Sequence, residues 1–489
     1  MKKINFLNII LIFSALSLIV IYVLSLFDFA KIENERIMRF VFIAVFFTAT
    51  LIVALNESRD YKFSLAKIFN SNLLVTISFS ALLILSISTH EMGIYASGIF
   101  VGTAVFMFFC NGKIYKPAWC HYFLFFYAVF LLFGTLGTPK GFRFPEMTYS
   151  FYLLPISFIA FQFSEKTLFK IAHFFFRVMT IYLIISVLYW WFNFQYLGIN
   201  FADWAFSKIQ IQAYIDDWTY QNELTPYGYP IFYFVSSWSY YFHPSYNSLV
   251  LLCALISGFY LFFKSKISKF ELIFFVSIFI FFQILVQSRI GLIGIFFVLI
   301  FTFFYYLKEK KKKITILLLI FLIIGSCVFL FFNKNTQNYL HDDTRKTDYT
   351  LAINYIQAHP LWGCGYYMQT EALREQEEIM KDVLPKIYNG KWYVHNQLLG
   401  DMLQFGIWGG IVLLILLFGI IFYAVKKRSY PLLAFILMMI LFMQIEEPLY
   451  GQAGITRFTA FLTFFVAISQ NNEEIRSFDL YYWIKNKIK

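Results

Sequence analysis

Long apolar blocks, separated by short polar breaks, dominate this chain. Leucine, isoleucine and phenylalanine fill blocks of about 17 to 25 residues, the length that an α-helix needs to cross about 30 Å of hydrocarbon. Helices are expected because they satisfy their own backbone hydrogen bonds where the bilayer offers no water. A composition of 60% hydrophobic and 14% charged residues excludes a soluble globular protein. The sequence therefore predicts an all-α, polytopic membrane helical bundle with about 12–14 transmembrane helices.

The expected spans divide the chain into three parts. Residues 1–332 hold the first eleven transmembrane helices, residues 333–394 form a large helical loop outside the cytoplasm, and residues 395–489 hold the last three transmembrane helices and a cytoplasmic tail. The spans are expected at roughly 6–27, 39–55, 72–89, 93–110, 118–136, 148–163, 168–194, 243–263, 271–287, 290–307, 314–332, 396–425, 430–445 and 457–470.

Positive charge indicates how these spans are oriented. Lysine and arginine are more frequent in every second break, including 308–313 and 426–428, which favours a cytoplasmic position for those breaks and for both termini. The net charge of +12 is therefore a topology signal. Because the basic residues are scattered over many short breaks, the charge does not predict nucleic acid binding.

Two long breaks lie on the predicted outer face. The first, at about 195–242, is crowded with tryptophan and tyrosine, which suits either an interfacial aromatic belt or a surface on which sugars stack. The second, 333–394, is predicted to contain an amphipathic helix at 347–358 and a further helix at about 369–383. A loop with helices of its own is more typical of a functional segment than of a spacer.

A histidine stands where the second loop runs into the next apolar helix. His395 and Asn396 precede that helix, and Gly406 and Gly409 follow at a spacing that lets another helix approach closely. Asn396 suits a helix start. His395 fits a capping or interfacial role, but an imidazole with a pKa near neutrality at the outer surface can also act as a base.

Three arginines need a partner or an interface. Arg289 lies between two apolar spans joined by almost no loop, so it is expected to snorkel to the interface or to meet an anion such as a diphosphate. Arg345 is either a second diphosphate clamp or an ion-pair partner of the neighbouring aspartates. Arg177, within a span, is expected to pair inside the bundle or to snorkel.

Other polar residues stand at the outer ends of spans. Glu446 and Glu447 are suited to acid–base chemistry or to pairing with an arginine, and solvated loop-edge charges fit equally well. His243 opens an outer-face helix, where capping is the default role. The sequence contains no nucleotide-binding motif and no metal-ligand spacing, so neither a cofactor nor a metal is expected.

Five segments in the second half of the chain form an ordered pattern: FHPSYNSLVLL (242–252), QSRIGLIG (287–294), the segment 345–367, HNQLLGDMLQFGIWGG (395–410) and EEPLYGQAGITRFTAF (446–461). In this order they resemble the O-antigen ligase and polymerase superfamily, bacterial membrane glycosyltransferases that act on undecaprenyl-diphosphate glycans. The resemblance covers roughly residues 240–465, and the first half of the chain matches only as a run of hydrophobic spans.

The resemblance implies a metal-independent, inverting glycan transfer on the periplasmic face of the bacterial inner (cytoplasmic) membrane. By analogy, His395 would deprotonate or position the acceptor hydroxyl, and Arg289 and Arg345 would bind the diphosphate leaving group. The other residues expected to contact substrate are Asn396, His243, Glu446 and Glu447.

The closing motif favours a ligase, which transfers the glycan from undecaprenyl diphosphate to lipid A-core. A polymerase of the same superfamily, which extends a growing glycan, is the first alternative, and a transporter of the same lipid-linked sugars is the second. The expected partners are the lipid-linked donor, the acceptor and the surrounding membrane lipids.

Overall fold

In the computed structural model of the chain, the described residues lie mostly in α-helices. The structure describes residues 41–42, 44–46, 48–50, 52–53, 73–87, 90–134, 149–197, 244–285, 288–309, 343–366, 368–379, 394–470 and 477–479. The chain divides into two compact units. The first comprises Met1–Lys113, Ala160–Ile295 and Asp479–Lys489, and the second comprises Ile114–Ile159 and Phe296–Phe478.

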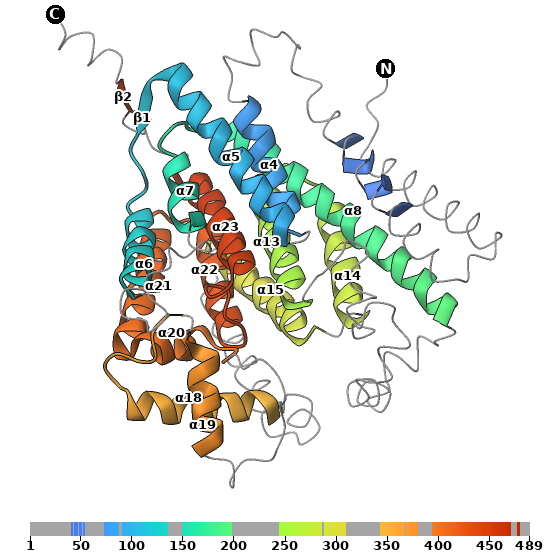
Figure 1. Cartoon of the computed structure of the whole chain (residues 1–489). Helices are drawn as coiled ribbons and strands as arrows, with labels where there is room; N and C mark the ends of the chain where they lie inside the picture. Colours follow the sequence, from blue (N-terminus) through green and yellow to red (C-terminus); the bar gives the residue numbers. More distant parts are fainter. Residues whose placement is uncertain are drawn as a thin grey trace, which may run out of the picture. The chain divides into compact units, whose positions relative to one another are not determined.

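The first unit is a group of apolar helices around α8. Its helices are α4 (Leu73–Leu85), α5 (His90–Asn111), α8 (Glu165–Leu197), α13 (Pro244–Phe263), α14 (Lys269–Leu285) and the start of α15 (Arg289–Glu309). Helices α4, α13 and α14 pack against α8, and α5 packs against α4 (Figure 1). Aromatic rings fill the core, as where Phe79 meets Phe100 with 5.0 Å between ring centroids. The abundance of phenylalanine in the sequence thus supplies the packing between helices.

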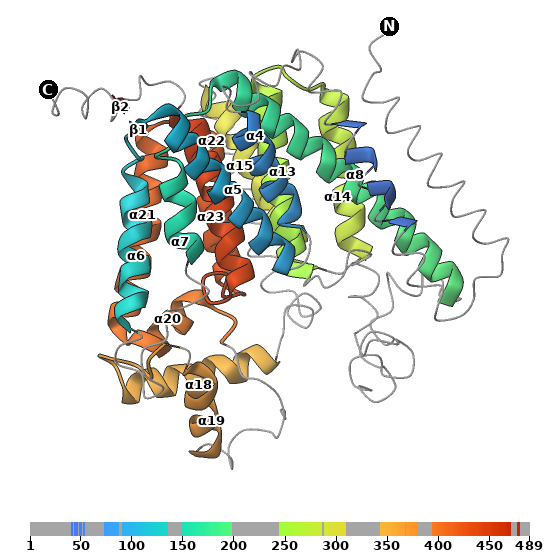
Figure 2. The same ribbon diagram turned by 45° about the horizontal axis from the view of Figure 1, so that its top comes forward.

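The second unit places short helices at one end of a set of longer ones. It contains α6 (Cys120–Gly134), α7 (Tyr149–Ser157), α18 (Asp343–Ala358), α19 (Gln369–Ile379), α20 (Gln397–Phe405), α21 (Ile407–Lys426), α22 (Tyr430–Met443) and α23 (Gln452–Gln470). Helix α21 packs against α6 and α22, and α23 packs against α7 and α22. Helices α18, α19 and α20 contact one another at one end of this set (Figures 1 and 2). Strands β1 (Lys113–Tyr115) and β2 (Ser477–Asp479) pair in a two-stranded sheet.

The apolar helices confirm the predicted all-α membrane fold. Three described helical stretches are long and apolar enough to cross a membrane: Glu165–Tyr189, Ser245–Phe263 and Ile407–Lys426. Along α21, Leu414, Phe418 and Phe422 recur every four residues and are 41%, 63% and 63% exposed. A contiguous apolar stripe of this kind is costly in water and is compatible with lipid hydrocarbon.

The helices expected inside the second outer loop are present. Helices α18 and α19 occupy the positions predicted at 347–358 and 369–383. Helix α18 begins earlier than predicted, at Asp343, because its polar first turn lacks the apolar spacing on which the prediction was based. The spans predicted at 6–27 and 314–332, and nearly all of the aromatic loop at 195–242, lie outside the described residues. The division of the chain into three parts by topology stays a prediction.

The apolar stretch predicted as one span at 396–425 is two helices in the structure. Helix α20 ends at Phe405 and α21 begins at Ile407, with Gly406 between them at a φ of 63°. A Cβ at Gly406 would lie 2.3 Å from the carbonyl carbon of Leu361, and the Ile407 N–H donates to the Pro360 carbonyl at 2.8 Å. The prediction of a continuous helix was wrong because a tight turn before α19 packs against this point and requires glycine.

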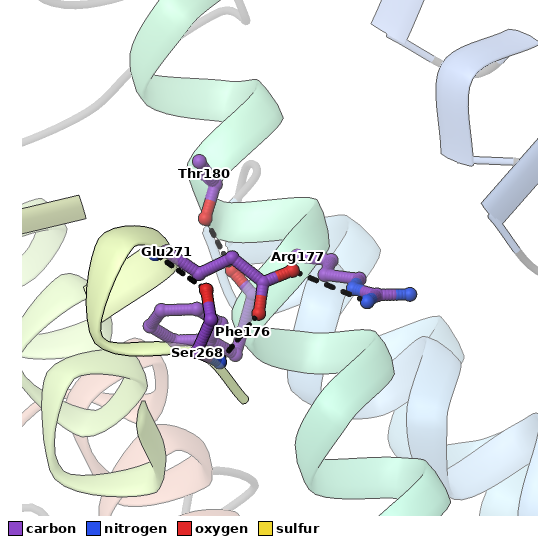
Figure 3. A network of polar contacts seen from close by, with 5 residues as sticks. All are labelled: Phe176, Arg177, Thr180, Ser268 and Glu271. Carbon is purple, nitrogen blue, oxygen red and sulfur yellow. Dashed lines mark hydrogen bonds and ion pairs between the residues drawn. The ribbon is translucent and has the colours of Figure 1, made fainter. Parts of the chain in front are cut away.

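Arg177 pairs within the first unit, which was one of its two predicted outcomes. Its Nη2 lies 3.3 Å from Oε1 of Glu271, and the two side chains are largely buried (Figure 3). The other carboxylate oxygen of Glu271 accepts a hydrogen bond from the Ser268 N–H at 3.0 Å, while Ser268 Oγ accepts one from the Glu271 N–H at 3.1 Å. This capping box fixes the carboxylate at the start of α14. The ion pair therefore joins α8 to α14 and compensates the charge of Arg177.

Candidate functional site

His395 and Asn396 form the start of α20, at the end of the second unit where α18 and α19 lie. His395 has a φ of 51°, in the left-handed region that His, Asn and Asp adopt more often than other non-glycine residues. Asn396 is the N-cap, because its Oδ1 accepts a hydrogen bond from the Leu399 N–H at 3.1 Å. The predicted helix-start role of Asn396 is confirmed.

The same end of α20 is tied to the loop between α22 and α23. Asn396 Nδ2 donates to the carbonyl of Gln444 at 3.2 Å. The Tyr349 hydroxyl, from α18, lies 3.0 Å from the Gln444 carbonyl and 3.2 Å from the His395 carbonyl. The carbonyl of His395 and the side chain of Asn396 are thus both held by hydrogen bonds, which restrains the backbone that presents the imidazole.

The imidazole of His395 faces a buried carboxylate. His395 Nδ1 lies 3.8 Å from Oε2 of Glu446, and their side chains are 34% and 6% exposed. This separation is too long for a direct hydrogen bond but is close enough for strong charge–charge attraction in a partly desolvated site. A carboxylate beside Nδ1 favours a proton on that nitrogen and makes Nε2 the basic nitrogen. One buried acid and one partly exposed base therefore stand side by side.

Glu447 is buried against α19 and α20. Gln369 Nε2 donates to its Oε2 at 3.0 Å, and its Oε1 is buried without a hydrogen-bond partner among the described residues. Burial raises the pKa of the Glu447 carboxyl to about 8, and the Gln369 hydrogen bond only partly offsets this. A Cβ at Gly400 would lie 2.8 Å from the carboxyl carbon of Glu447. Glycine at position 400 therefore makes room for this carboxyl group.

A third buried acid, Asp401, lies on α20, about one turn after the start of this helix. It is 2% exposed and accepts hydrogen bonds from the Tyr127 hydroxyl at 2.8 Å and from Gln397 Nε2 at 2.8 Å. Gln397 Oε1 in turn accepts from the Leu449 N–H at 2.7 Å. Burial raises the pKa of the Asp401 carboxyl to about 7, against the two hydrogen bonds that lower it.

Sequence reasoning missed Asp401 and its neighbours. An acid inside the predicted span 396–425 is itself a signal, because acids within apolar helices are rare and face polar partners. Tyr127, which donates to Asp401, and Gln369, which donates to Glu447, come from distant parts of the chain, so the sequence offers no comparable signal for them. Gln397 lies one helical turn before Asp401 on the same helix.

The remaining predicted site residues are placed only in part. Arg289 is the first residue of α15 and belongs to the first unit, while Arg345 lies in the first turn of α18 in the second unit. The side chains of both arginines are outside what the structure describes, and His243 lies just before α13, also outside the described residues. The convergence of the two arginines with His395 stays a prediction.

The described geometry is suited to proton transfer at the end of a helical bundle. The His395 side chain is partly exposed, and Glu446 can stabilise the imidazolium that forms when His395 takes a proton. Within the described part of the chain, no group of three or more His, Cys, Asp or Glu side chains is arranged to hold a metal ion.

Residues 272–414 match the model of a family described as O-antigen ligase. The matched segment runs from α14 to the first half of α21 and includes Arg289, Arg345 and His395. No curated protein matches the chain. The match confirms the expected resemblance for residues 272–414, which hold three of the five ordered segments.

Proposed function

From the match of residues 272–414 to the O-antigen ligase family model, we propose that this protein is a ligase that transfers a glycan from undecaprenyl diphosphate to lipid A-core. The chain is a membrane glycosyltransferase of the ligase and polymerase type. In the proposed reaction the active site faces the periplasm from the inner membrane, and His395 is the base.

The observation that carries the proposal is the His395–Glu446 pair at a helix start. The imidazole is partly exposed, its neighbour is a buried carboxylate, and the backbone around it is fixed by hydrogen bonds. A base needs such a fixed position to reach an acceptor hydroxyl in a productive geometry. A histidine that served only as a surface residue would need none of these constraints.

Charge at the opposite end of α21 supports the periplasmic orientation. Helix α21 starts beside the site, and it ends at Lys426, followed by Lys427 and Arg428 in the turn before α22. Basic residues at the ends of membrane helices favour the cytoplasmic side. The other end of α21, with His395 near it, then faces the periplasm.

In the proposed reaction, His395 Nε2 takes the proton of the acceptor hydroxyl as that oxygen attacks the anomeric carbon of the donor. The new carbon–oxygen bond forms while the bond from the anomeric carbon to the diphosphate breaks, and its electron pair leaves with the diphosphate. Attack opposite the leaving group inverts the anomeric configuration. Glu446 stabilises the imidazolium, and Arg289 and Arg345 neutralise the charge that develops on the diphosphate without a metal.

A polymerase would use the same donor chemistry with a carrier-linked glycan as acceptor. The two activities are separated by deleting the gene and analysing lipopolysaccharide on a gel. Loss of all long chains, with polymer accumulating on the carrier lipid, indicates a ligase. Cores capped with a single repeat unit indicate a polymerase and refute the ligase assignment.

The role of His395 is tested by complementing the deletion with His395→Ala. We expect transfer to fall by about a hundredfold or more, because the general base is lost. The matched control is His359→Ala, which removes an exposed histidine at the end of α18. Both variants are compared at equal amounts in the membrane. Near-normal transfer by His395→Ala would remove this residue from the mechanism.

A further inference from the structure

Asp401 is a buried acid to which the proposed mechanism assigns no role. It receives two hydrogen bonds from different elements, one from Tyr127 on α6 and one from Gln397 on its own helix. Both oxygens of the carboxylate are therefore used as acceptors. A buried charge is expensive unless its hydrogen bonds are complete, so these contacts indicate a fixed polar network and not an accidental burial.

The bond from Gln397 to Asp401 determines which way the Gln397 amide points. With its NH2 group donating to Asp401 Oδ1 at 2.8 Å, the carboxamide oxygen is directed to the Leu449 N–H, 2.7 Å away. If the amide turned over, its NH2 group would face the N–H of Leu449, and two donors would oppose each other. Asp401 thus selects the amide orientation that can hold Leu449.

Leu449 lies in the same short loop as Glu446, three residues further along the chain. The loop between α22 and α23 is attached to α20 at two points: Gln444 is held by Asn396, and Leu449 is held by Gln397. Glu446 lies between these two attachments. The position of its carboxylate relative to His395 therefore depends on both of them.

We propose that Asp401 is a positioning residue for glycan transfer, which acts through Gln397 to hold the loop carrying Glu446 against the helix start carrying His395. This inference rests on the proposed function of His395. Tyr127 completes the network by holding the second oxygen of Asp401, so α6 also contributes to the alignment.

A double-mutant cycle tests whether Asp401 acts through Gln397. The variants are Asp401→Ala, Gln397→Met and the two combined, in the purified full-length protein with an undecaprenyl-diphosphate glycan as donor and core lipopolysaccharide as acceptor. We expect each single variant to lower kcat by about tenfold, with the KM for the donor within about twofold of the wild type. The double variant is expected to be no slower than the slower single variant, because both substitutions remove the same alignment.

Asp401→Asn is the conservative variant of the series. Its amide oxygen can still accept from Gln397, while its NH2 group donates to the Tyr127 oxygen, so we expect kcat within about threefold of the wild type. This variant keeps the test informative if Asp401→Ala does not fold. Loss of transfer in Asp401→Asn equal to that in Asp401→Ala would show that the charge itself is needed, and would overturn the inference.

His395→Ala in the same assay separates the two hypotheses. Suppose that the wild type transfers glycan and His395→Ala does not, but the effects of Asp401→Ala and Gln397→Met multiply in the double variant. The positioning role of Asp401 is then refuted, while the role of His395 as the base is not. Wild-type kcat in both single variants refutes the positioning role as well. If His395→Ala retains full transfer, the proposed base is wrong whatever the cycle gives.

Discussion

Glu447 offers the sharpest test of the electrostatics of this site. Its carboxyl group is buried between Gln369 and Gly400, and burial raises its pKa to about 8 from an ordinary value of 4.5. At neutral pH this group is therefore mainly the uncharged acid in the folded protein. Glu447→Gln replaces it with a neutral group of the same shape that can still accept from Gln369.

The raised pKa makes folding depend on pH. Below about pH 4.5 the carboxyl is protonated in both the folded and the unfolded state, so folding buries no charge at this position. Between about pH 4.5 and 8 the unfolded chain ionises while the folded protein keeps the proton, so stability falls as pH rises. Above about pH 8 the loss is complete, on the order of 5 kcal/mol at about 1.4 kcal/mol for each pKa unit. The Glu447→Gln variant does not lose this stability, because its side chain does not ionise.

The assay is the apparent melting temperature of the purified protein in detergent at pH values from 5 to 9. We expect wild type and Glu447→Gln to melt at similar temperatures near pH 5, and the variant to melt several degrees higher near pH 9. Asp401 and the other titrating groups are present in both proteins and largely cancel in the difference. Glu375→Gln, an exposed acid of α19, serves as the control and should show no such trend. A difference between wild type and Glu447→Gln that stays constant with pH would refute the reasoning.

Two further predictions concern packing and the leaving group. Gly409→Ala should destabilise the protein by about 1–3 kcal/mol, because its Cβ would lie 2.1 Å from the Asp401 carbonyl oxygen, a backbone atom that cannot move aside. Gly98→Ala, with nothing within 4 Å, is the control, and equal melting temperatures of the two variants would contradict the prediction. Arg289→Ala and Arg345→Ala should each lower transfer by about a hundredfold, and the Lys variants should be partly active, because a point charge replaces a planar bidentate donor. Wild-type transfer in both Ala variants would exclude diphosphate binding by these arginines.

Much of the local structure could be predicted from local sequence features. Helices α8, α13, α14 and α22 lie close to the spans expected from hydrophobicity, since an apolar block of sufficient length specifies a helix without reference to the rest of the chain. The N-cap at Asn396 was predictable for the same reason, because capping is a contact within one turn. The position of His395 at a helix start also followed from sequence order.

The prediction failed where distant segments meet. The break at Gly406 could not be predicted from the apolar pattern, because it depends on the turn at Pro360 and Leu361. Glycine in a helical pattern is compatible both with close helix packing and with a turn. Only the contact with a separate segment decided between them.

By itself, the sequence determined that this protein is a set of membrane helices with a histidine at the start of one of them. Tertiary structure decided which acid stands beside that histidine, which glutamine holds Glu447, and that Tyr127 and Asp401 share a hydrogen bond across 274 residues of chain. The physical reason is the range of the forces involved. Transfer of apolar side chains out of water acts on each block separately, whereas a hydrogen bond or ion pair exists only when folding brings its two atoms within a few ångströms.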